Sequence, residues 1–257
     1  MKFGICGGPD TFAVRPKGLD YLECTVGHVL PREDDTAFDK ALVKLKGACA
    51  PFLAANCFLP GDLKSTGPDV DKAALDKYVS TAFARAQKVG IKRIVFGSGG
   101  SRQVPEGFDK AKAFAQLADH CRWFGKIAAR HDIVIVIEPL QVAECNIINT
   151  VREGTKLAKT VDHANVKVLA DFYHMACDGE DPDAIREAGE LLQHVHVAEK
   201  EKRTAPGMEG DDLRPFLKAL KDIGYSGMVS IEASLGDDAA KQAPVSLAEL
   251  RKQYEEA

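Results

Sequence analysis

The sequence has few features that would place the protein in a membrane or outside the cell. No apolar run among its 257 residues approaches the ~18 that a membrane-spanning helix needs, and the first residues, MKFGICGGPD, form no charged region followed by a long apolar one. The seven cysteines lie between Cys6 and Cys177 and include no CxxC pair. A chain of this size does not depend on disulfides, so we expect reduced thiols in a cytoplasmic protein without membrane contact.

The sequence also lacks an excess of charge of either sign. It contains 34 basic and 38 acidic residues, well mixed, and its formal net charge is −4. Nucleic acids and anionic membranes are bound by strongly basic surfaces, so neither is an expected partner. The glycines of GICGGPD do not have the GxGxxG spacing of a dinucleotide-binding loop. We therefore expect a small molecule as the ligand.

Eight short runs rich in Val and Ile alternate with helix-like stretches along the chain. Such runs, bounded by Gly, Pro or charged residues, are typical of strands buried on both faces. The runs lie at 2–6, 21–26, 52–58, 93–98, 133–138, 166–171, 194–199 and 228–233. The helix-like stretches lie at about 36–47, 70–89, 107–130, 149–161, 182–190, 211–223 and 246–256.

Only the first connection is predicted not to hold a full crossover helix. Residues 7–20, GGPDTFAVRPKGLD, contain two prolines. Because the chain has no internal repeat, low-complexity tract or linker, the alternation predicts one α/β domain over residues 1–257. Its fold is predicted to be a (β/α)₈ TIM barrel whose first crossover helix is shortened or missing. A doubly wound open sheet is the main alternative.

Each of the last four runs ends in a residue that can bind a divalent metal. These residues are Glu138 in IVIVIEPL, Asp171 in VKVLADFYH, His196 in QHVHVAE and Glu232 in GMVSIEAS. Their spacings of 33, 25 and 36 residues each fit one strand, one helix and loops, so parallel strands can bring all four to one end of the barrel. Two Glu, one Asp and one His form a set of oxygen and nitrogen ligands. Such a set is more typical of a Mn²⁺, Mg²⁺ or Co²⁺ site than of a structural zinc site, which is rich in sulfur.

The two glutamates of this set suit proton transfer. Glu138 and Glu232 could work as base and acid on opposite faces of a substrate, because a bound metal also stabilises the enediolate that forms beside a carbonyl. A rim ion pair for Glu138 and a helix N-cap for Asp171 are the alternatives. His194 shares a strand face with His196, and we interpret it as an interior histidine held by a backbone carbonyl.

On these residues the chain resembles the xylose isomerase-like TIM-barrel sugar isomerases and epimerases, a family that includes ketose 3-epimerases and hydroxypyruvate isomerases. The likeness covers nearly the whole chain. It implies that Glu138, Asp171, His196 and Glu232 hold one divalent ion, with Mn²⁺ the first choice and Mg²⁺ or Co²⁺ the others. It also implies that Glu138 and Glu232 are the acid and base pair.

The resemblance further implies residues that hold the substrate. The family's glutamate six residues beyond the first metal ligand falls on Glu144, and its histidine three beyond the metal aspartate falls on His174. The family's arginine six beyond the metal histidine falls on Lys202, and Arg203 stands next to it in EKRTAPG. We expect Lys202 to hold the substrate and Arg203 to matter less; a solvated charged loop is the alternative.

The sequence and the resemblance together predict a metal-dependent isomerase or epimerase that acts on a small ketose or hydroxy-ketone. A homo-oligomer is compatible with this function. A sugar lyase on the same scaffold is an alternative, and a non-catalytic barrel subunit is another. Apurinic-type endonucleases share the DxxH pattern but hold zinc through further histidines, and this chain has no histidine after His196.

Overall fold

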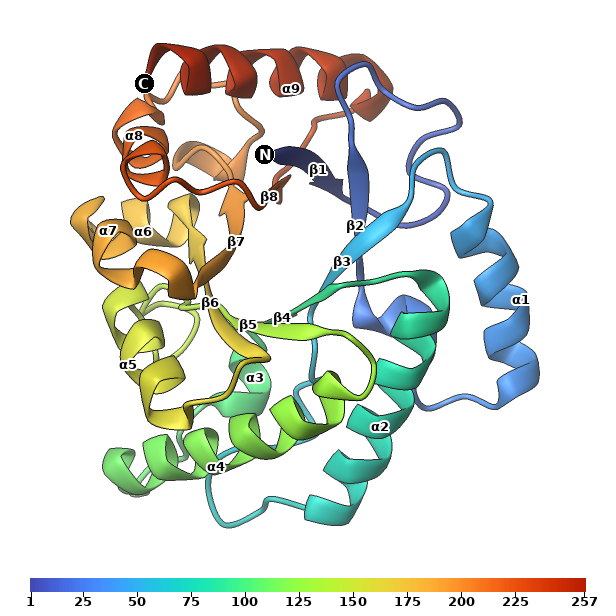
Figure 1. Ribbon diagram of the computed structural model, residues 1–257, viewed down its shortest axis with the longest axis vertical. Helices are drawn as coiled ribbons and strands as arrows, with labels where there is room; N and C mark the ends of the chain where they lie inside the picture. Colours follow the sequence, from blue (N-terminus) through green and yellow to red (C-terminus); the bar gives the residue numbers. More distant parts are fainter.

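Eight parallel strands close into a barrel in the computed structural model, which describes residues 1–257 (Figure 1). Each strand pairs with the next one in the chain, and β8 pairs with β1, so the sheet has no free edge. The strands are β1 (Lys2–Cys6), β2 (Tyr21–Thr25), β3 (Phe52–Asn56), β4 (Arg93–Phe96), β5 (Val134–Ile137), β6 (Val166–Asp171), β7 (Leu192–Val197) and β8 (Met228–Ile231). The predicted barrel is confirmed.

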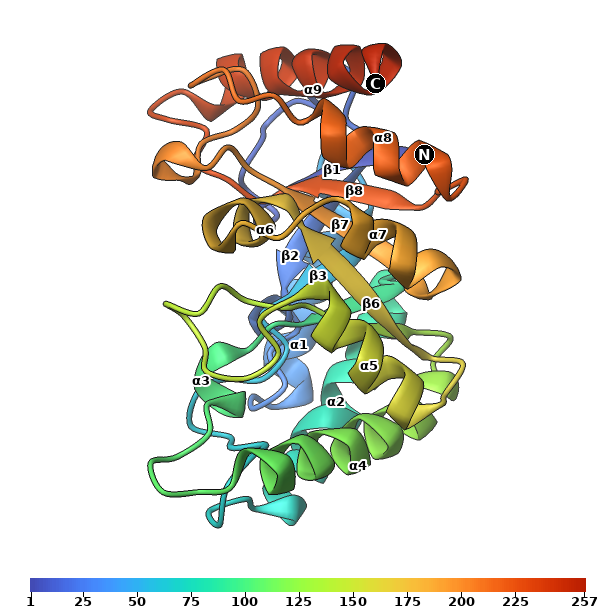
Figure 2. The same cartoon turned by 90° about the vertical axis from the view of Figure 1, so that its left-hand side faces the viewer.

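Helices surround the barrel on its outer side (Figures 1 and 2). The connection between β1 and β2 contains no helix, as the two prolines predicted. The α-helices are α1 (Asp35–Lys46), α2 (Lys72–Val89), α3 (Gly99–Arg102), α4 (Lys110–Ala129), α5 (Val151–Val161), α6 (Phe172–Asp178), α7 (Asp183–Ala188), α8 (Arg214–Asp222) and α9 (Ala239–Glu256). Short 3₁₀ helices are η1 (Val26–Val29), η2 (Gly189–Leu191) and η3 (Glu201–Arg203). No helix is both long enough and apolar enough to span a membrane.

Local sequence signals explain most helix boundaries. The side chain of Asp71 accepts hydrogen bonds from two backbone N–H groups of the first turn of α2, and Gly90, with φ of 108°, ends that helix. The last helix differs from the prediction: α9 begins at Ala239, is capped by Asp238 and continues through Pro244. An aspartate cap followed by helix-forming residues therefore extends the predicted 246–256 segment toward its N-terminus.

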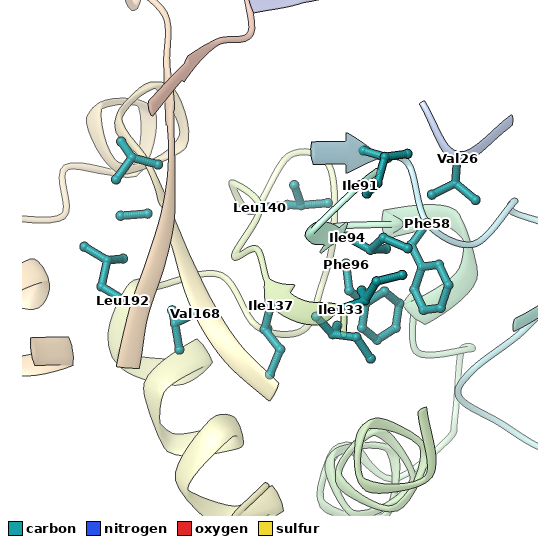
Figure 3. Packing of buried hydrophobic residues seen from close by; sticks show 14 of the residues in the cluster. Val26, Phe58, Ile91, Ile94, Phe96, Ile133, Ile137, Leu140, Val168 and Leu192 are labelled. Carbon is teal, nitrogen blue, oxygen red and sulfur yellow. The ribbon is translucent and has the colours of Figure 1, made fainter. Parts of the chain in front are cut away.

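Aromatic side chains fill the space between the barrel and the helices. Phe58 stacks on Phe83 of α2 with ring centroids 5.2 Å apart and meets the edges of Phe96 and Phe124 at 5.7 Å. Figure 3 shows Phe58 and Phe96 packed beside the aliphatic residue Ile94. Burial of such rings dominates core energetics, so this layer holds α2 and α4 against the barrel.

Gly4 on β1 makes room for the ring of Tyr21 on β2. A Cβ atom at Gly4 would lie 2.5 and 2.7 Å from ring atoms of Tyr21, which is closer than atoms pack. The tyrosine crosses over β1 and its hydroxyl lies 2.6 Å from Ser230 Oγ on β8. The missing side chain at Gly4 therefore allows a hydrogen bond across three strands inside the barrel.

Gly4→Ala is expected to lower the free energy of unfolding by about 1–3 kcal/mol, because the added methyl group displaces a fully buried ring. Urea unfolding followed by circular dichroism measures this loss. In the Tyr21→Ala background the same change should cost much less, since the ring that it strikes is gone. An equal cost in both backgrounds would mean that the ring is not what excludes a side chain at Gly4.

Candidate active site

Glu138, Asp171, His196 and Glu232 meet at one end of the barrel. Glu138 follows β5, Asp171 ends β6, His196 lies near the end of β7 and Glu232 follows β8. One ligand atom of each lies within 4.8 Å of those of the others. Figure 2 shows the arrowheads of β6 and β8 directed to the same side of the barrel. Parallel strands thus bring together the side chains that the spacing singled out, and their binding of an ion stays a prediction.

Hydrogen bonds satisfy only part of this cluster. His196 Nδ1 lies 3.0 Å from Glu138 Oε1 and 3.5 Å from Glu232 Oε2. Asn56 on β3 donates to Glu232 Oε1 at 2.7 Å, and a backbone N–H of α6 donates to Asp171 Oδ1 at 2.8 Å. Asp171 Oδ2 is buried and has no hydrogen-bond partner. A buried carboxylate oxygen without a partner, beside two further carboxylates, fits the binding of a cation.

The charges in the cluster move the pKa values of its members apart. Burial raises the pKa of Glu138. Burial acts in the same direction on Glu232, but the charge and hydrogen bond of His196 and the charge of Arg203 outweigh it and lower the pKa of Glu232. Burial disfavours a charged His196, but the charges of Glu23 and Glu232 and hydrogen bonds to carboxylates raise its pKa well above the usual value. Of the two glutamates, Glu138 therefore holds a proton more readily than Glu232 does.

Arg203 reaches the cluster from the loop after β7. Its Nη2 donates to Glu232 Oε2 and lies 3.6 Å from Asp171 Oδ2, while its Nη1 lies 3.8 Å from Glu144 Oε1. The guanidinium also stacks over the ring of Tyr173, 4.6 Å from its centre. A planar guanidinium can hold two oxygen atoms at once, so Arg203 is placed to bind neighbouring oxygens of a small ligand.

Lys202, which was expected from the sequence to hold the substrate, turns away from the cluster in this structure. Its side chain is 68% exposed and pairs with Glu209 at 3.1 Å. Lys202 and Arg203 both have left-handed backbone conformations, with φ of 56° and 52°. Because of this turn within η3, the residue that faces the cluster is Arg203, seven positions beyond His196, and not Lys202, six positions beyond it. Each such conformation costs about 1 kcal/mol or more outside glycine, so the loop must be held by other contacts.

The buried carboxylate of Glu199 holds this loop. Its Oε1 accepts hydrogen bonds from the backbone N–H groups of Gly207, Gly210 and Asp211 at 2.8, 3.1 and 3.2 Å, and its Oε2 accepts one from that of Glu209 at 2.5 Å. Bonds to a charged acceptor are stronger than neutral ones. Sequence reasoning missed Glu199, although an acidic residue directly after the apolar run of β7 repeats the pattern of the neighbouring strand ends.

The other two residues expected to hold substrate lie at the edge of the cluster. His174 is buried in α6, and its Nε2 lies 3.5 Å from Asp171 Oδ2. Its Nδ1 has no hydrogen-bond partner. Glu144, in the loop after β5, keeps 40% of its side chain exposed and faces Arg203. The structure therefore gathers His174, Glu144 and Arg203 around the same cluster, and their contact with substrate stays a prediction.

Glu23 and Asn56 also contact the cluster, and both were missed in the sequence. Glu23 Oε1 lies 2.9 Å from His196 Nε2, and Glu23 Oε2 lies 2.8 Å from His194 Nε2. The expectation that a backbone carbonyl holds His194 is wrong, because this carboxylate takes that place. The available signal was a charged residue inside the otherwise apolar run YLECTV. No comparable signal marks Asn56.

The chain matches known proteins over most of its length. A family model described as a xylose isomerase-like TIM barrel matches residues 13–253. The D-psicose 3-epimerase of Ruminiclostridium cellulolyticum is 32% identical over 178 residues, which make up 66% of this chain and 59% of that protein. The hydroxypyruvate isomerase of Escherichia coli is 26% identical over 158 residues, or 60% of each protein.

Solved structures share the fold over the whole chain. The structure of D-psicose 3-epimerase with D-tagatose from Clostridium cellulolyticum H10 has a TM-score of 0.84 at 23% identity, and the superposition covers 99% of both chains. At that identity the likeness shows the fold alone. The sequence matches to the epimerase and the isomerase each span less than two thirds of the relative.

Replacing Glu199 with Gln is expected to loosen the loop that carries Arg203. The amide nitrogen of Gln cannot accept from backbone N–H groups, and a hydrogen bond to a charged group contributes about 1.5–3 kcal/mol. Hydrogen exchange should show lost protection at the amides of Gly207 and Glu209. Glu201→Gln, at an exposed position of the same loop, is the control. Unchanged protection in Glu199→Gln would show that other contacts hold the loop.

Proposed function

Because the chain belongs to the xylose isomerase-like TIM barrel family, we propose that it is a divalent-metal-dependent sugar isomerase or epimerase. Its substrate is a small ketose or hydroxy-ketone, and the reaction moves a proton through an enediolate. The observation that carries this proposal is the convergence of Glu138, Asp171, His196 and Glu232 at one end of the barrel. Relatives named as an epimerase and as an isomerase support the reaction class.

The donor set supports a hard or borderline cation, with Mn²⁺ the first choice. Glu138, Asp171, His196 and Glu232 would hold it through oxygen atoms and one nitrogen, and Mg²⁺ and Co²⁺ suit the same set. The unpartnered buried Oδ2 of Asp171 supports an ion at this position. When bound, the ion supplies positive charge that polarises a substrate carbonyl and stabilises negative charge on its oxygens.

Glu138 and Glu232 exchange the proton in this proposal. One carboxylate removes the proton beside the carbonyl, and the other, as the neutral acid, delivers a proton to the resulting enediolate. The two side chains come from β5 and β8, which are separated by β6 and β7 in the barrel. Approach from two sides suits removal from one face of the substrate and delivery to the other.

Arg203, His174 and Glu144 orient the substrate in this proposal. Arg203 offers a planar pair of N–H donors beside Glu232 and Glu144. His174 Nε2 faces the cluster, 3.5 Å from Asp171 Oδ2, where it can donate a hydrogen bond to a substrate oxygen. Holding the carbonyl and the neighbouring hydroxyl between the two glutamates lowers the entropic cost of proton transfer.

The reaction class is tested by deuterium exchange. Protein loaded with Mn²⁺ is incubated in D₂O with a panel of ketoses and aldoses, and exchange at the carbon beside the carbonyl is followed by NMR. Treatment with EDTA should abolish the exchange, and Mn²⁺ should restore it. Exchange that survives complete removal of metal would contradict metal dependence, and exchange with no sugar of the panel would contradict the proposed substrate class.

Glu138→Gln and Glu232→Gln should each abolish exchange while the fold is retained. Each change removes a proton-transfer group and one negative charge from the ion site. The measurement is the exchange rate at saturating Mn²⁺, with circular dichroism as the check on folding. A variant that keeps more than about a tenth of the wild-type rate, a loss below ~1.4 kcal/mol of barrier, would show that its glutamate does not transfer the proton.

Arg203→Ala should damage the reaction and Lys202→Ala should not. Arg203 lies within the cluster, whereas Lys202 points to solvent, so the pair forms a matched comparison of adjacent cations. We expect at least a tenfold lower kcat/KM for Arg203→Ala, about 1.4 kcal/mol, with Mn²⁺ affinity not reduced, because the guanidinium contributes no ligand to the ion. Damage confined to Lys202→Ala would mean that the loop rearranges when substrate binds.

A further inference from the structure

Glu23 occupies the interior of the barrel, below the cluster that carries the proposed chemistry. It lies on β2, is fully buried and faces the side chains of β7 and β8. Both of its oxygens are engaged: Oε1 with His196 Nε2 at 2.9 Å, and Oε2 with His194 Nε2 at 2.8 Å and Ser230 Oγ at 2.5 Å. No lysine or arginine pairs with it.

The partners of Glu23 determine where the histidine protons lie. A carboxylate accepts hydrogen bonds and does not donate them, so His194 and His196 must each present an N–H at Nε2. His196 lies between two acidic groups, with Nε2 on Glu23 and Nδ1 on Glu138 at 3.0 Å and Glu232 at 3.5 Å. Of the two ring nitrogens, Nδ1 is the one that faces the proposed ion.

We propose that Glu23 is a positioning residue for the metal site: it fixes the ring of His196 and retains the proton on Nε2, so that Nδ1 is presented to the ion. This inference rests on the proposed function, because it concerns the same ion. A carboxylate behind a metal-binding imidazole orients the ring and makes the ligand nitrogen more basic. Glu23 thereby contributes to metal affinity without touching the ion.

The surroundings of Glu23 hold it in one orientation. His194 Nδ1 is buried without a partner, so the bond to Glu23 is the only hydrogen bond of that ring. Ser230 donates to the same carboxylate, and its Oγ lies 2.6 Å from the hydroxyl of Tyr21. The ring of Tyr21 has room because Gly4 has no side chain. These contacts link four strands to the orientation of a single imidazole.

Titration calorimetry with Mn²⁺ tests the proposal. Glu23→Gln keeps the size of the side chain but has one acceptor oxygen in place of two, and its NH₂ group opposes a histidine N–H. We expect Mn²⁺ to bind about 10–100-fold more weakly to this variant than to wild type. Ser230→Ala is the matched control, because it removes one donor to Glu23 and leaves both histidine bonds in place. Its Mn²⁺ affinity should fall by less than about tenfold.

The proton position is measured directly in the wild-type protein. In protein with ¹⁵N-labelled histidine and loaded with diamagnetic Mg²⁺ or Zn²⁺, NMR should show His196 with its proton on Nε2 and none on Nδ1. Coordination through Nδ1 itself requires the proton on Nε2, so the spectrum tests which ring nitrogen faces the ion, and the Mn²⁺ affinity of Glu23→Gln tests the role of Glu23. A His196 proton on Nδ1 would overturn the proposal even if Glu23→Gln fails to fold.

Two outcomes overturn the inference while the proposed function stands. One is Mn²⁺ affinity of folded Glu23→Gln equal to that of wild type, and the other is a His196 proton on Nδ1 in the metal-loaded protein. Wild-type protein that binds none of these ions would overturn the proposed metal dependence and the inference with it. Weaker binding by Glu23→Gln, together with a protonated Nε2 in wild type, supports the role of Glu23.

Discussion

The close approach of three carboxylates is the constraint around which this end of the barrel is arranged. Ligand atoms of Glu138, Asp171 and Glu232 lie within 4.8 Å of one another and of His196. Two like charges at such a distance repel by about 3–4 kcal/mol at an effective dielectric constant near 20. His196 and Arg203 supply compensating positive charge, yet Asp171 Oδ2 still accepts no hydrogen bond. The arrangement thus fits a cation, and the raised pKa of His196 reflects the carboxylates around it.

The interior of the barrel is divided between apolar and polar packing. Val95, Val136 and Leu169, from β4, β5 and β6, form a small apolar cluster of the kind that usually fills such barrels. The opposite wall carries buried Glu23 and His194 instead. Burying these groups is costly unless all of them are bonded, and nearly every polar atom there has a partner. Glu23 of this polar wall bonds to His196 of the carboxylate cluster, so packing and site geometry are coupled.

In the loop after β7, one residue holds the backbone and another faces the carboxylates. Glu199 binds several backbone N–H groups at once, and this charged anchor stabilises a turn that Lys202 and Arg203 would not adopt by themselves. The turn aims Arg203 at the carboxylates and leaves Lys202 in solvent. The free-energy cost of the backbone conformation at Arg203 is thereby offset by the hydrogen bonds that Glu199 accepts.

The sequence by itself determined the alternation of strands and helices, the missing first crossover helix and the four side chains that converge. Burial on both faces requires continuous apolar runs, and parallel strands bring their ends together whatever the loops contain. The pairing of Glu23 with His194, 171 residues apart, and the inward turn of Arg203 were decided only by the tertiary structure. The register of the barrel strands and the conformation of the loops determine which polar atoms come into contact. Neither produces a periodic pattern of residues in the sequence, so neither could be predicted from it.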